Sequence, residues 1–282
     1  MQFINKRNRN NRKRGHLISR HFLNSCWHEE IHQNVNCNYD DFSRRKDIKL
    51  LLYREQKGLC CYCMRQIKPL GSNKNATIEH VMPQKVKEEG DPFYFDKLKF
   101  FRKHVTTKAI DKTKRWKRNK FPHFCAYENL TLSCDGSLYT NEDEIHNSHL
   151  HLTCNNVRGS ERIEPLFFMK HIAQDLEYGE DGLIYFTKEF MESNAYTDKY
   201  EETIDSLRLE HPTLVLIRKG WAKIAKRYSN KDVKDAINDE VKRLDIIIYM
   251  NLKINEETKL NNDIYWKLFT QYSWFGDYFR NK

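Results

Sequence analysis

The sequence predicts an α+β fold that is mostly α-helical, with one small pair of strands and a four-cysteine zinc site. Three observations lead to this prediction. Apolar residues recur at helical spacing along much of the chain. Two short apolar segments, 76–81 and 127–134, have the composition and length of strands. A C-x-x-C pair and two later cysteines, which flank the second strand and the start of the next helix, suit a zinc ligand set.

The N-terminal part is expected to contain a basic arm and two helices. Residues 1 to about 15 are polar and basic, which predicts a flexible arm. Apolar residues at near-helical spacing predict helices at 17–34 and 42–56. Gly58 follows the second helix, and glycine suits the position after a helix C-terminus. A tight turn that contains Cys60 comes next.

The remaining elements alternate strands with helices. Pro83 closes the first strand, and the aromatic, basic segment 92–120 predicts a helix and an extended loop. A helix begins near Cys154, and 183–186 forms a strand after the Asp181-Gly182 turn. Four further segments are mostly helical by period: 197–210, 212–228, 231–254 and 258–279. We expect three regions: 1–40 as a basic arm and helix, 41–180 as a core with a basic insertion, and 181–282 as a helical C-terminal region.

The net charge of +10 is unevenly distributed. Residues 1–20 carry seven Lys or Arg and no acid, and residues 85–120 carry thirteen Lys or Arg against five acids. Such clusters are typical of proteins that bind phosphate backbones, although a solvated basic surface is the alternative. Because the chain has no run of 18 apolar residues and no apolar leader segment, we expect a cytoplasmic protein without membrane contact.

The cysteine spacing predicts a structural zinc ion. Cys60 and Cys63 stand two residues apart, so that one turn can present two thiolates to a tetrahedral ion. Cys134 and Cys154 are the candidates for the other ligands, although nineteen residues separate them. Four thiolates would leave no open position, which is typical of a structural site. The alternatives are a redox-active C-x-x-C pair and buried free thiols.

The other four cysteines receive no metal-binding role. Cys61 lies inside the tight turn and is expected to point away from the ion. Cys26, Cys37 and Cys125 have no identifiable partner and are expected to be buried as small apolar residues. Eight cysteines in a cytoplasmic protein favour metal binding over disulfides.

A candidate catalytic pair lies near the end of the first strand. The segment Ile78-Glu79-His80-Val81-Met82-Pro83 places a carboxylate beside an imidazole. Phosphodiester hydrolysis needs a deprotonated water, a cation for the developing charge and assistance for the leaving oxygen. Histidine, with an ordinary pKa of about 6.5, suits the first task, and a carboxylate with an amide oxygen suits Mg²⁺. For the Glu-His pair alone, an ordinary strand end is the alternative interpretation.

Four motifs together resemble the pattern of the HNH endonucleases, whose catalytic unit is the ββα-metal fold. They are Cys60-x-x-Cys63, Ile78-Glu79-His80-Val81-x-Pro83, Glu128-Asn129-Leu130-x-Leu132-x-Cys134 and Cys154-Asn155-x-x-Arg158-Gly159. More narrowly, the chain resembles the PtuB-like HNH nucleases of Septu-type and retron-linked antiphage defence systems. A later segment, Thr203-Ile204-x-x-Leu207-x-Leu209 followed by Leu214 and Arg218, also resembles a motif of that subgroup. The resemblance covers roughly residues 40 to 220.

The resemblance implies a role for each of five residues. His80 would be the general base, and Asn129 would fix the loop and orient the His80 ring. Glu79, in place of the more common Asp, would bind a catalytic Mg²⁺ or Mn²⁺ together with Asn155. Arg158 would lie near the scissile phosphate, and the zinc would hold the β-hairpin to the helix.

Other side chains compete with Asn155 for the third metal position. The loop between Cys134 and Cys154 holds His146, His149 and His151, of which His151 is the strongest rival. Asn156 is a weaker one. Exposed loop histidines without a metal role are the alternative.

The resemblance also implies a partner, an ABC-type ATPase of the PtuA-like kind, and a place within a retron complex is a further expectation. No Walker A motif occurs, so ATP control must come from another chain. The helical region 197–282 is a candidate docking surface; a helical cap on the core is the alternative. DNA is the favoured substrate. RNA such as tRNA, or a non-catalytic zinc module that binds nucleic acid, are the competing interpretations.

Overall fold

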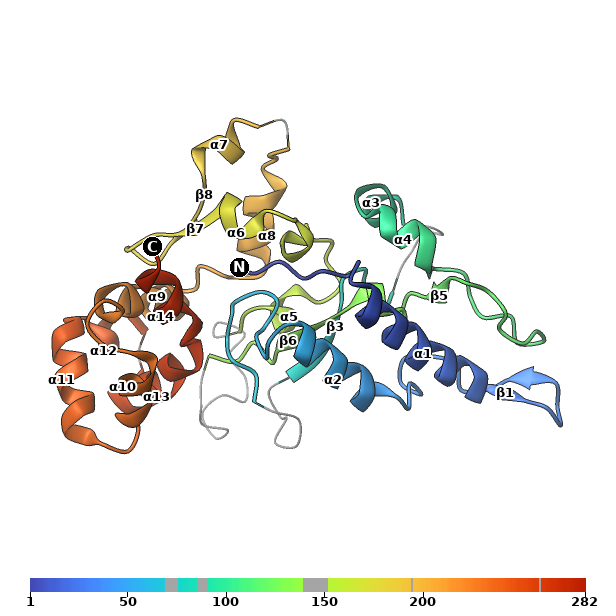
Figure 1. Ribbon diagram of the computed structural model, residues 1–282, viewed down its shortest axis with the longest axis horizontal. Coiled ribbons are helices and arrows are strands. Elements are labelled where there is room, and N and C mark those ends of the chain that lie inside the picture. Colours follow the sequence, from blue (N-terminus) through green and yellow to red (C-terminus); the bar gives the residue numbers. More distant parts are fainter. Residues whose placement is uncertain (69–75, 86–90, 139–151, 194, 259) are drawn as a thin grey trace.

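The computed structural model describes residues 1–68, 76–85, 91–138, 152–193, 195–258 and 260–282. It is a mixed α+β protein in which helices predominate, and the strands of the described residues form four two-stranded sheets. Figure 1 shows an elongated molecule, with the C-terminal helices at one end and the N-terminal helix α1 toward the other. The fold class predicted from the sequence is therefore confirmed in its broad terms.

The helices and strands follow one another in the order below. Up to the four-residue helix α5 they are α1 (Arg9–Ser25), β1 (Trp27–His28), β2 (Gln33–Asn34), α2 (Arg45–Glu55), β3 (Ala76–His80), α3 (Pro92–Lys97), α4 (Lys99–His104), β4 (Val105–Thr106), β5 (Phe121–Pro122), the 3-10 helix η1 (Tyr127–Asn129), β6 (Leu130–Cys134) and α5 (Asn155–Arg158). After it come η3 (Leu166–Phe168), α6 (Ile172–Asp175), β7 (Leu176–Tyr178), β8 (Ile184–Phe186), α7 (Lys188–Met191), α8 (Lys199–Ser206), α9 (Pro212–Ile224), α10 (Asn230–Asp235), α11 (Glu240–Met250), α12 (Ile254–Thr258), α13 (Asn262–Phe269), η4 (Thr270–Tyr272) and α14 (Trp274–Arg280).

The two strands predicted around the candidate site pair with each other. β3 and β6 are antiparallel, in a register that places Ala76 opposite Cys134 and His80 opposite Leu130. The fully buried side chain of Gln56, just after α2, bonds to both the N–H and the carbonyl of Leu132, each at 2.7 Å. An amide side chain thus pairs with the free edge of β6, where another strand would otherwise be needed.

The N-terminal residues are ordered and packed, so the expectation of a flexible arm is wrong. Met1 and Ile4 are buried in the core, and the Ile4 N–H donates to the Phe167 carbonyl at 2.7 Å. Helix α1 begins at Arg9 because the Asn8 side chain accepts from the N–H groups at the helix start. The predicted helix therefore lies about eight residues earlier than its apolar spacing indicated.

A second correction concerns Cys26 and Cys37, for which the sequence offered no partner. The structure joins them in a disulfide with a Cα–Cα distance of 5.7 Å. The short β1–β2 hairpin reverses the chain after α1, and the Val35 N–H donates to the Cys26 carbonyl at 2.8 Å. This local reversal brings the two cysteines together, whereas Cys125 remains a buried free thiol as expected.

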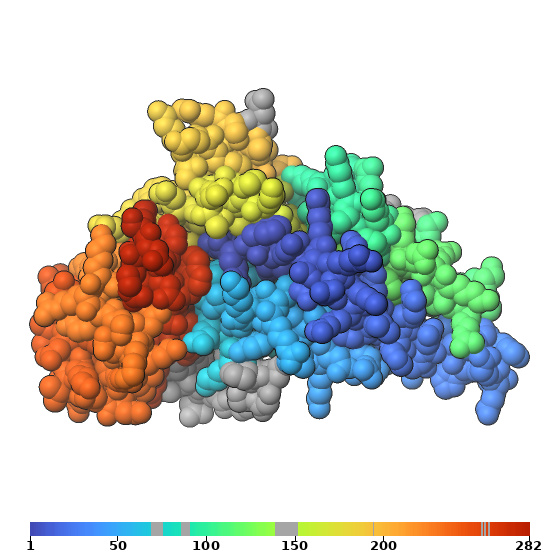
Figure 2. Space-filling model, in the orientation of Figure 1, coloured from blue at the N-terminus to red at the C-terminus, as the bar shows by residue number. Residues whose placement is uncertain are grey.

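The C-terminal helices form a separate lobe, drawn in orange and red in Figures 1 and 2. Its core stacks Trp221 of α9 on Phe269 of α13, with ring centroids 4.6 Å apart. Gly276 lets α14 approach α9, because a Cβ there would lie 2.6 Å from the Trp221 ring. The predicted helix 231–254 is divided into α10 and α11, since Asp239 caps a new helix start. Among the described residues, no helix has the length and apolar character needed to cross a membrane.

Candidate functional site

The four cysteines predicted to bind zinc come together. Cys60, Cys63, Cys134 and Cys154 are all buried, and their sulfur atoms lie within 4.8 Å of one another. The Cys63 and Cys134 sulfurs are 3.7 Å apart. A tetrahedral zinc ion with Zn–S bonds of about 2.3 Å separates its sulfur ligands by about 3.8 Å. The spacing therefore suits a structural zinc ion, while Cys61 lies outside the group and accepts from the Thr131 hydroxyl.

A closed loop explains how two cysteines so far apart in sequence reach the same cluster. Cys134 ends β6, and Cys154 directly precedes α5. Between them, the N–H and the hydroxyl of Thr153 both donate to the Gly136 carbonyl, at 2.9 and 3.1 Å. Gly136 has φ of +71°, and a Cβ there would lie 2.0 Å from the Thr153 carbonyl oxygen. These contacts hold the segment after Cys134 against the segment before Cys154.

The thiol electrostatics favour a bound cation. Burial opposes ionisation of Cys60, but hydrogen bonds with Cys134, Cys154 and the other thiols outweigh it and lower the pKa of Cys60 well below its usual value. Burial, followed by hydrogen bonds to Cys134 and Cys60, raises the pKa of Cys154 well above its usual value. Ionised thiols this close together repel one another, and a bound dication would allow them to ionise together.

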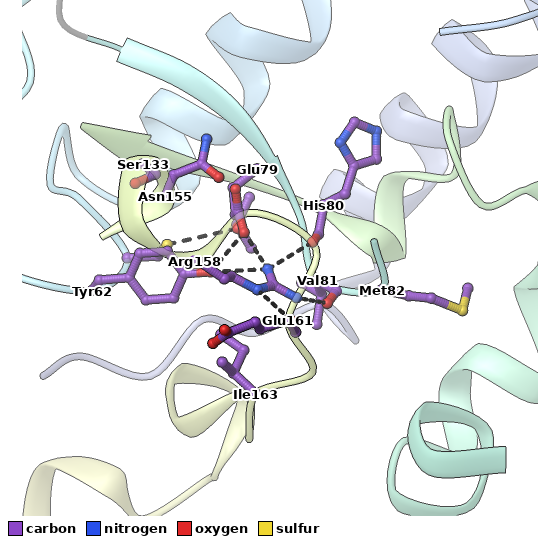
Figure 3. Close-up of polar contacts among 12 residues, drawn as sticks. Tyr62, Glu79, His80, Val81, Met82, Ser133, Asn155, Arg158, Glu161 and Ile163 are labelled. Atoms are coloured by element: carbon purple, nitrogen blue, oxygen red, sulfur yellow. Dashed lines mark hydrogen bonds and ion pairs between the residues drawn. The ribbon is translucent and has the colours of Figure 1, made fainter. Parts of the chain in front are cut away.

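At the opposite end of β3, the Glu79 carboxylate is buried in a polar cluster. Its Oε1 accepts from the Tyr62 hydroxyl at 2.9 Å and forms an ion pair with Arg158. The Arg158 guanidinium is itself buried and donates to the carbonyls of His80, at 2.8 Å, and Val81. Figure 3 shows these contacts around the guanidinium. Burial raises the pKa of Glu79, although Arg158 and Tyr62 both favour its ionised form.

His80 ends β3 and points the other way. Figure 3 shows its ring directed away from Arg158 and from the Glu79 carboxylate. Its Nε2 lies 3.0 Å from the Phe124 carbonyl oxygen, which can only accept, so Nε2 carries the proton. Nδ1 then accepts from the Gln84 amide at 3.2 Å. Because burial lowers the pKa of His80 to about 4, the ring is neutral at pH 7 with its lone pair on Nδ1.

Asn129 closes the loop behind His80. Its Oδ1 accepts from the Met82 N–H at 2.7 Å, and its Nδ2 donates to the carbonyls of Met82 and His123, at 3.0 and 2.9 Å. These bonds join the segment that follows His80 to the segment that carries the Phe124 carbonyl. Asn129 therefore acts on the His80 ring indirectly, through the position of Phe124.

Asn155 lies over the face of β3 that carries Glu79. Its Nδ2 donates to the Thr77 hydroxyl at 3.2 Å, and Thr77 shares a strand face with Glu79 two residues later. Asn156 instead donates to the Asp135 carbonyl. The structure thus gathers Glu79, Asn155 and Arg158 on one side of the strand end, with His80 and Asn129 on the other. The rivals His146, His149 and His151 lie outside the described residues.

Sequence reasoning missed several partners of this site. Tyr62 and Tyr94 each hydrogen-bond to Arg158 at 3.2 Å, and Gln84 covers the His80 lone pair. Nothing in the spacing of these residues indicated such contacts, because each depends on tertiary packing. Only the position of Tyr62 inside the C-x-x-C turn placed it near the predicted site.

Both basic segments of the sequence line cavities. One cavity of about 500 Å³ lies along α1 and is lined by Arg9, Arg12, Lys13, His16, Leu17 and Arg20. A second, of about 440 Å³, is lined by Ala109, Asp111, Lys114, Arg115, Trp116, Lys117 and Arg118. In the second, the Trp116 Nε1 is buried without a hydrogen-bond partner among the described residues. Cations beside an aromatic ring are a common arrangement for contacts with phosphates and bases.

Searches against protein-family models, curated proteins and solved structures found no match for this chain.

Proposed function

We propose that this chain is a metal-dependent endonuclease of the HNH (ββα-metal) type that hydrolyses phosphodiester bonds in nucleic acid. One observation carries the proposal. The β3–β6 hairpin ends in a Glu-His pair, and a buried four-cysteine cluster attaches that hairpin to the helix that carries Asn155. This is the order strand, strand, helix that such an enzyme requires. In this proposal, the cysteine cluster holds a structural Zn²⁺.

His80 is the proposed general base. Its ring is neutral at pH 7, and the Phe124 carbonyl fixes the tautomer that leaves Nδ1 free of a proton. The exposed Gln84 side chain must first leave Nδ1 so that a water molecule can take its place. A substrate phosphate nearby would raise the pKa of the ring, since negative charge favours its protonated form. The Phe124 carbonyl would then stabilise the imidazolium during the transfer.

Glu79 and Asn155 are the proposed ligands of the catalytic metal. The Glu79 carboxylate on β3 and the Asn155 amide oxygen on α5, which lies over the same strand face, are the donors that a hard cation such as Mg²⁺ or Mn²⁺ prefers. That ion would stabilise the charge that develops on the phosphoryl group. Arg158 already neutralises Glu79, so the carboxylate would be shared between the guanidinium and the ion. We therefore assign Arg158 to positioning Glu79 and the strand end.

The two basic cavities support nucleic acid as the substrate, with DNA as the first choice. Both lie in segments whose excess of Lys and Arg suits a phosphate backbone. RNA such as tRNA presents the same phosphates and is the competing substrate. A non-catalytic zinc module that binds nucleic acid would use the same cavities but has no task for the neutral His80 ring.

An ATPase partner completes the proposal, as expected for a nuclease of an antiphage defence complex. Helix α11 exposes apolar side chains on one face, among them Val241, Leu244 and Ile248, which are 71%, 45% and 73% exposed. Their spacing of three and four residues places them in one stripe. An uncovered apolar stripe of this kind supports a protein-docking role for the C-terminal lobe.

A cleavage assay tests the proposal directly. The wild-type chain, alone and with an ATPase partner, is incubated with plasmid DNA and with total RNA in Mg²⁺ or Mn²⁺. The His80→Ala variant should lose cleavage by about 10²-fold or more, the usual contribution of a general base. His28→Ala, which changes an exposed histidine, should cleave like wild type. A folded, zinc-loaded His80→Ala protein that still cleaves would remove His80 as the base, and no cleavage by wild type would favour the binding module.

A further inference from the structure

A second group of metal-ligating side chains lies beneath the basic helix α1. His16 comes from α1, His104 ends α4, and Glu128 lies in η1. One ligand atom of each lies within 4.8 Å of the others. Glu128 is fully buried, and both histidines are half-buried. Three segments far apart in the sequence therefore converge on one point outside the nuclease site proposed above.

The Glu128 carboxylate gives an independent sign that this group is incomplete. Its Oε1 contacts the His16 Nε2 at 2.7 Å, but its Oε2 is buried and has no hydrogen-bond partner among the described residues. A buried carboxylate oxygen without a donor is costly, and such atoms usually face a bound ion or water. The unsatisfied oxygen belongs to the same carboxylate that the two imidazoles approach.

The packing of α1 is specialised to bring His16 to this point. Gly15 touches η1 so closely that a Cβ would lie 2.4 Å from the Tyr127 ring. One turn later, the Ser19 hydroxyl donates to the Cys125 carbonyl at 2.6 Å. These two contacts fix the helix directly over the segment that carries Glu128. A larger residue at position 15 would push His16 away from the carboxylate.

We propose that His16, His104 and Glu128 bind a divalent transition-metal ion, Zn²⁺ as the simplest choice, which fastens α1 to α4 and η1. Two imidazoles and one carboxylate are an established ligand set for zinc and leave one position for water. Mg²⁺ is disfavoured, because it selects oxygen ligands. The site is separate from the cysteine cluster and does not depend on nuclease activity.

The ion requires only a small adjustment of the side chains. With bonds of about 2.1 Å, neighbouring ligands of a tetrahedral zinc stand about 3.4 Å apart. The His16 Nε2 and Glu128 Oε1 atoms at 2.7 Å must separate slightly, which the half-exposed His16 ring can accommodate. The same ring lines the cavity of about 500 Å³ whose other polar residues are Arg9, Arg12, Lys13 and Arg20. These cations weaken the ion's binding, and the ion in turn strengthens the attraction of this face for phosphate.

The competing interpretation is an ordinary His16–Glu128 ion pair with the His104 ring beside it, at a centroid distance of 5.0 Å from His16. That arrangement holds no metal. The two interpretations therefore differ in one measurable quantity, the number of zinc ions that the full-length chain retains.

Zinc content decides between them. The full-length chain is supplied with Zn²⁺, dialysed against metal-free buffer and analysed by elemental mass spectrometry. We expect two zinc ions per chain in the wild type, and one in His104→Ala and in Glu128→Gln. His21→Ala removes an exposed histidine from the same helix and should keep both. The zinc that remains in the cysteine cluster shows that each variant has kept its folded core.

Cobalt substitution gives a second readout. Co²⁺ at the cysteines gives intense sulfur-to-metal absorption, and Co²⁺ at the new site adds only weaker visible bands. Those weaker bands should disappear in His104→Ala and Glu128→Gln, with the thiolate absorption unchanged. A wild type that retains a single zinc, or variants that keep both ions, would overturn the proposal. Neither outcome bears on whether His80 cleaves nucleic acid.

Discussion

The two ends of the β3–β6 hairpin carry different chemistry and were not equally accessible from the sequence. At the Cys134 end, four identical side chains converge with the spacing of a tetrahedral ion. At the His80 end, a carboxylate, a guanidinium and an imidazole are each held by several unlike partners. Cysteines at metal-ligand spacing favour one interpretation, so each cysteine of the group could be predicted from the others. A buried polar network has many arrangements, and packing selects among them.

The difference also divides the tasks of the hairpin. A zinc ion at the cysteine end would fix the hairpin to α5, and four thiolate ligands would leave it no open position for a substrate. The other end contains a neutral, buried histidine and an ion-paired glutamate, to which the proposed function assigns the general base and a metal ligand. Substitutions at either end can break this division, with the greatest loss of stability expected at the cysteine end.

The largest effect is expected from Cys134→Ser, which removes one of the four candidate zinc ligands. Structural zinc contributes about 10 kcal/mol or more of apparent binding free energy, comparable to the whole stability of a domain. The variant should lose its zinc and its cooperative thermal unfolding together, as measured by metal analysis and calorimetry. Cys61→Ser is the matched control, because Cys61 lies in the same turn but outside the cluster. Full zinc content in Cys134→Ser would exclude Cys134 as a ligand.

A smaller loss is expected from Arg158→Met at the other end. The substitution leaves the buried Glu79 charge without its cationic partner and two strand-end carbonyls without the guanidinium donor. Breaking a buried ion pair from one side costs about 3–5 kcal/mol in free energy of unfolding, which urea titration can measure. Arg102→Met breaks an exposed pair with Asp96 and should cost less than about 1 kcal/mol.

The double variant Arg158→Met/Glu79→Gln sharpens this test. Removing the unpaired Glu79 charge as well should recover part of the stability lost in Arg158→Met, because the two residues are energetically coupled. If Arg158→Met is as stable as wild type but inactive, the guanidinium has a direct role at the phosphate instead of a positioning role.

The same contrast explains what the sequence could predict. The strands at β3 and β6 and the grouping of Cys60, Cys63, Cys134 and Cys154 followed from local composition and spacing. The structure confirms that the two strands pair and that the four cysteines converge. The Cys26–Cys37 disulfide and the burial of Met1 could not be predicted, because the residues around them are mostly polar and indicated exposed chain. Their positions depend on the β1–β2 reversal and on core contacts with distant segments.

In the candidate site, the residues could be predicted from the sequence, but their contacts could not. The five site residues, Arg158 among them, could be selected as a set. Neither the ion pair of Arg158 with Glu79 nor the amide that covers His80 could be predicted. Arg158 reaches Glu79 across 79 positions of sequence, so no spacing rule could identify this pairing. Long-range pairings of unlike groups require the assembled core.

The smallest effect is expected from Gln84→Ala, which uncovers the lone pair of His80. The Gln84 amide bonds to His80 Nδ1 at 3.2 Å, and a single neutral hydrogen bond contributes about 1 kcal/mol net. Removing it lets water reach Nδ1 without first displacing the amide, so the cleavage rate should rise by about fivefold at most, while zinc content stays unchanged. Plasmid cleavage under single-turnover conditions measures this change. If Gln84→Ala instead lowers the rate as far as His80→Ala does, the amide orients the ring for catalysis, and the water must approach from another side.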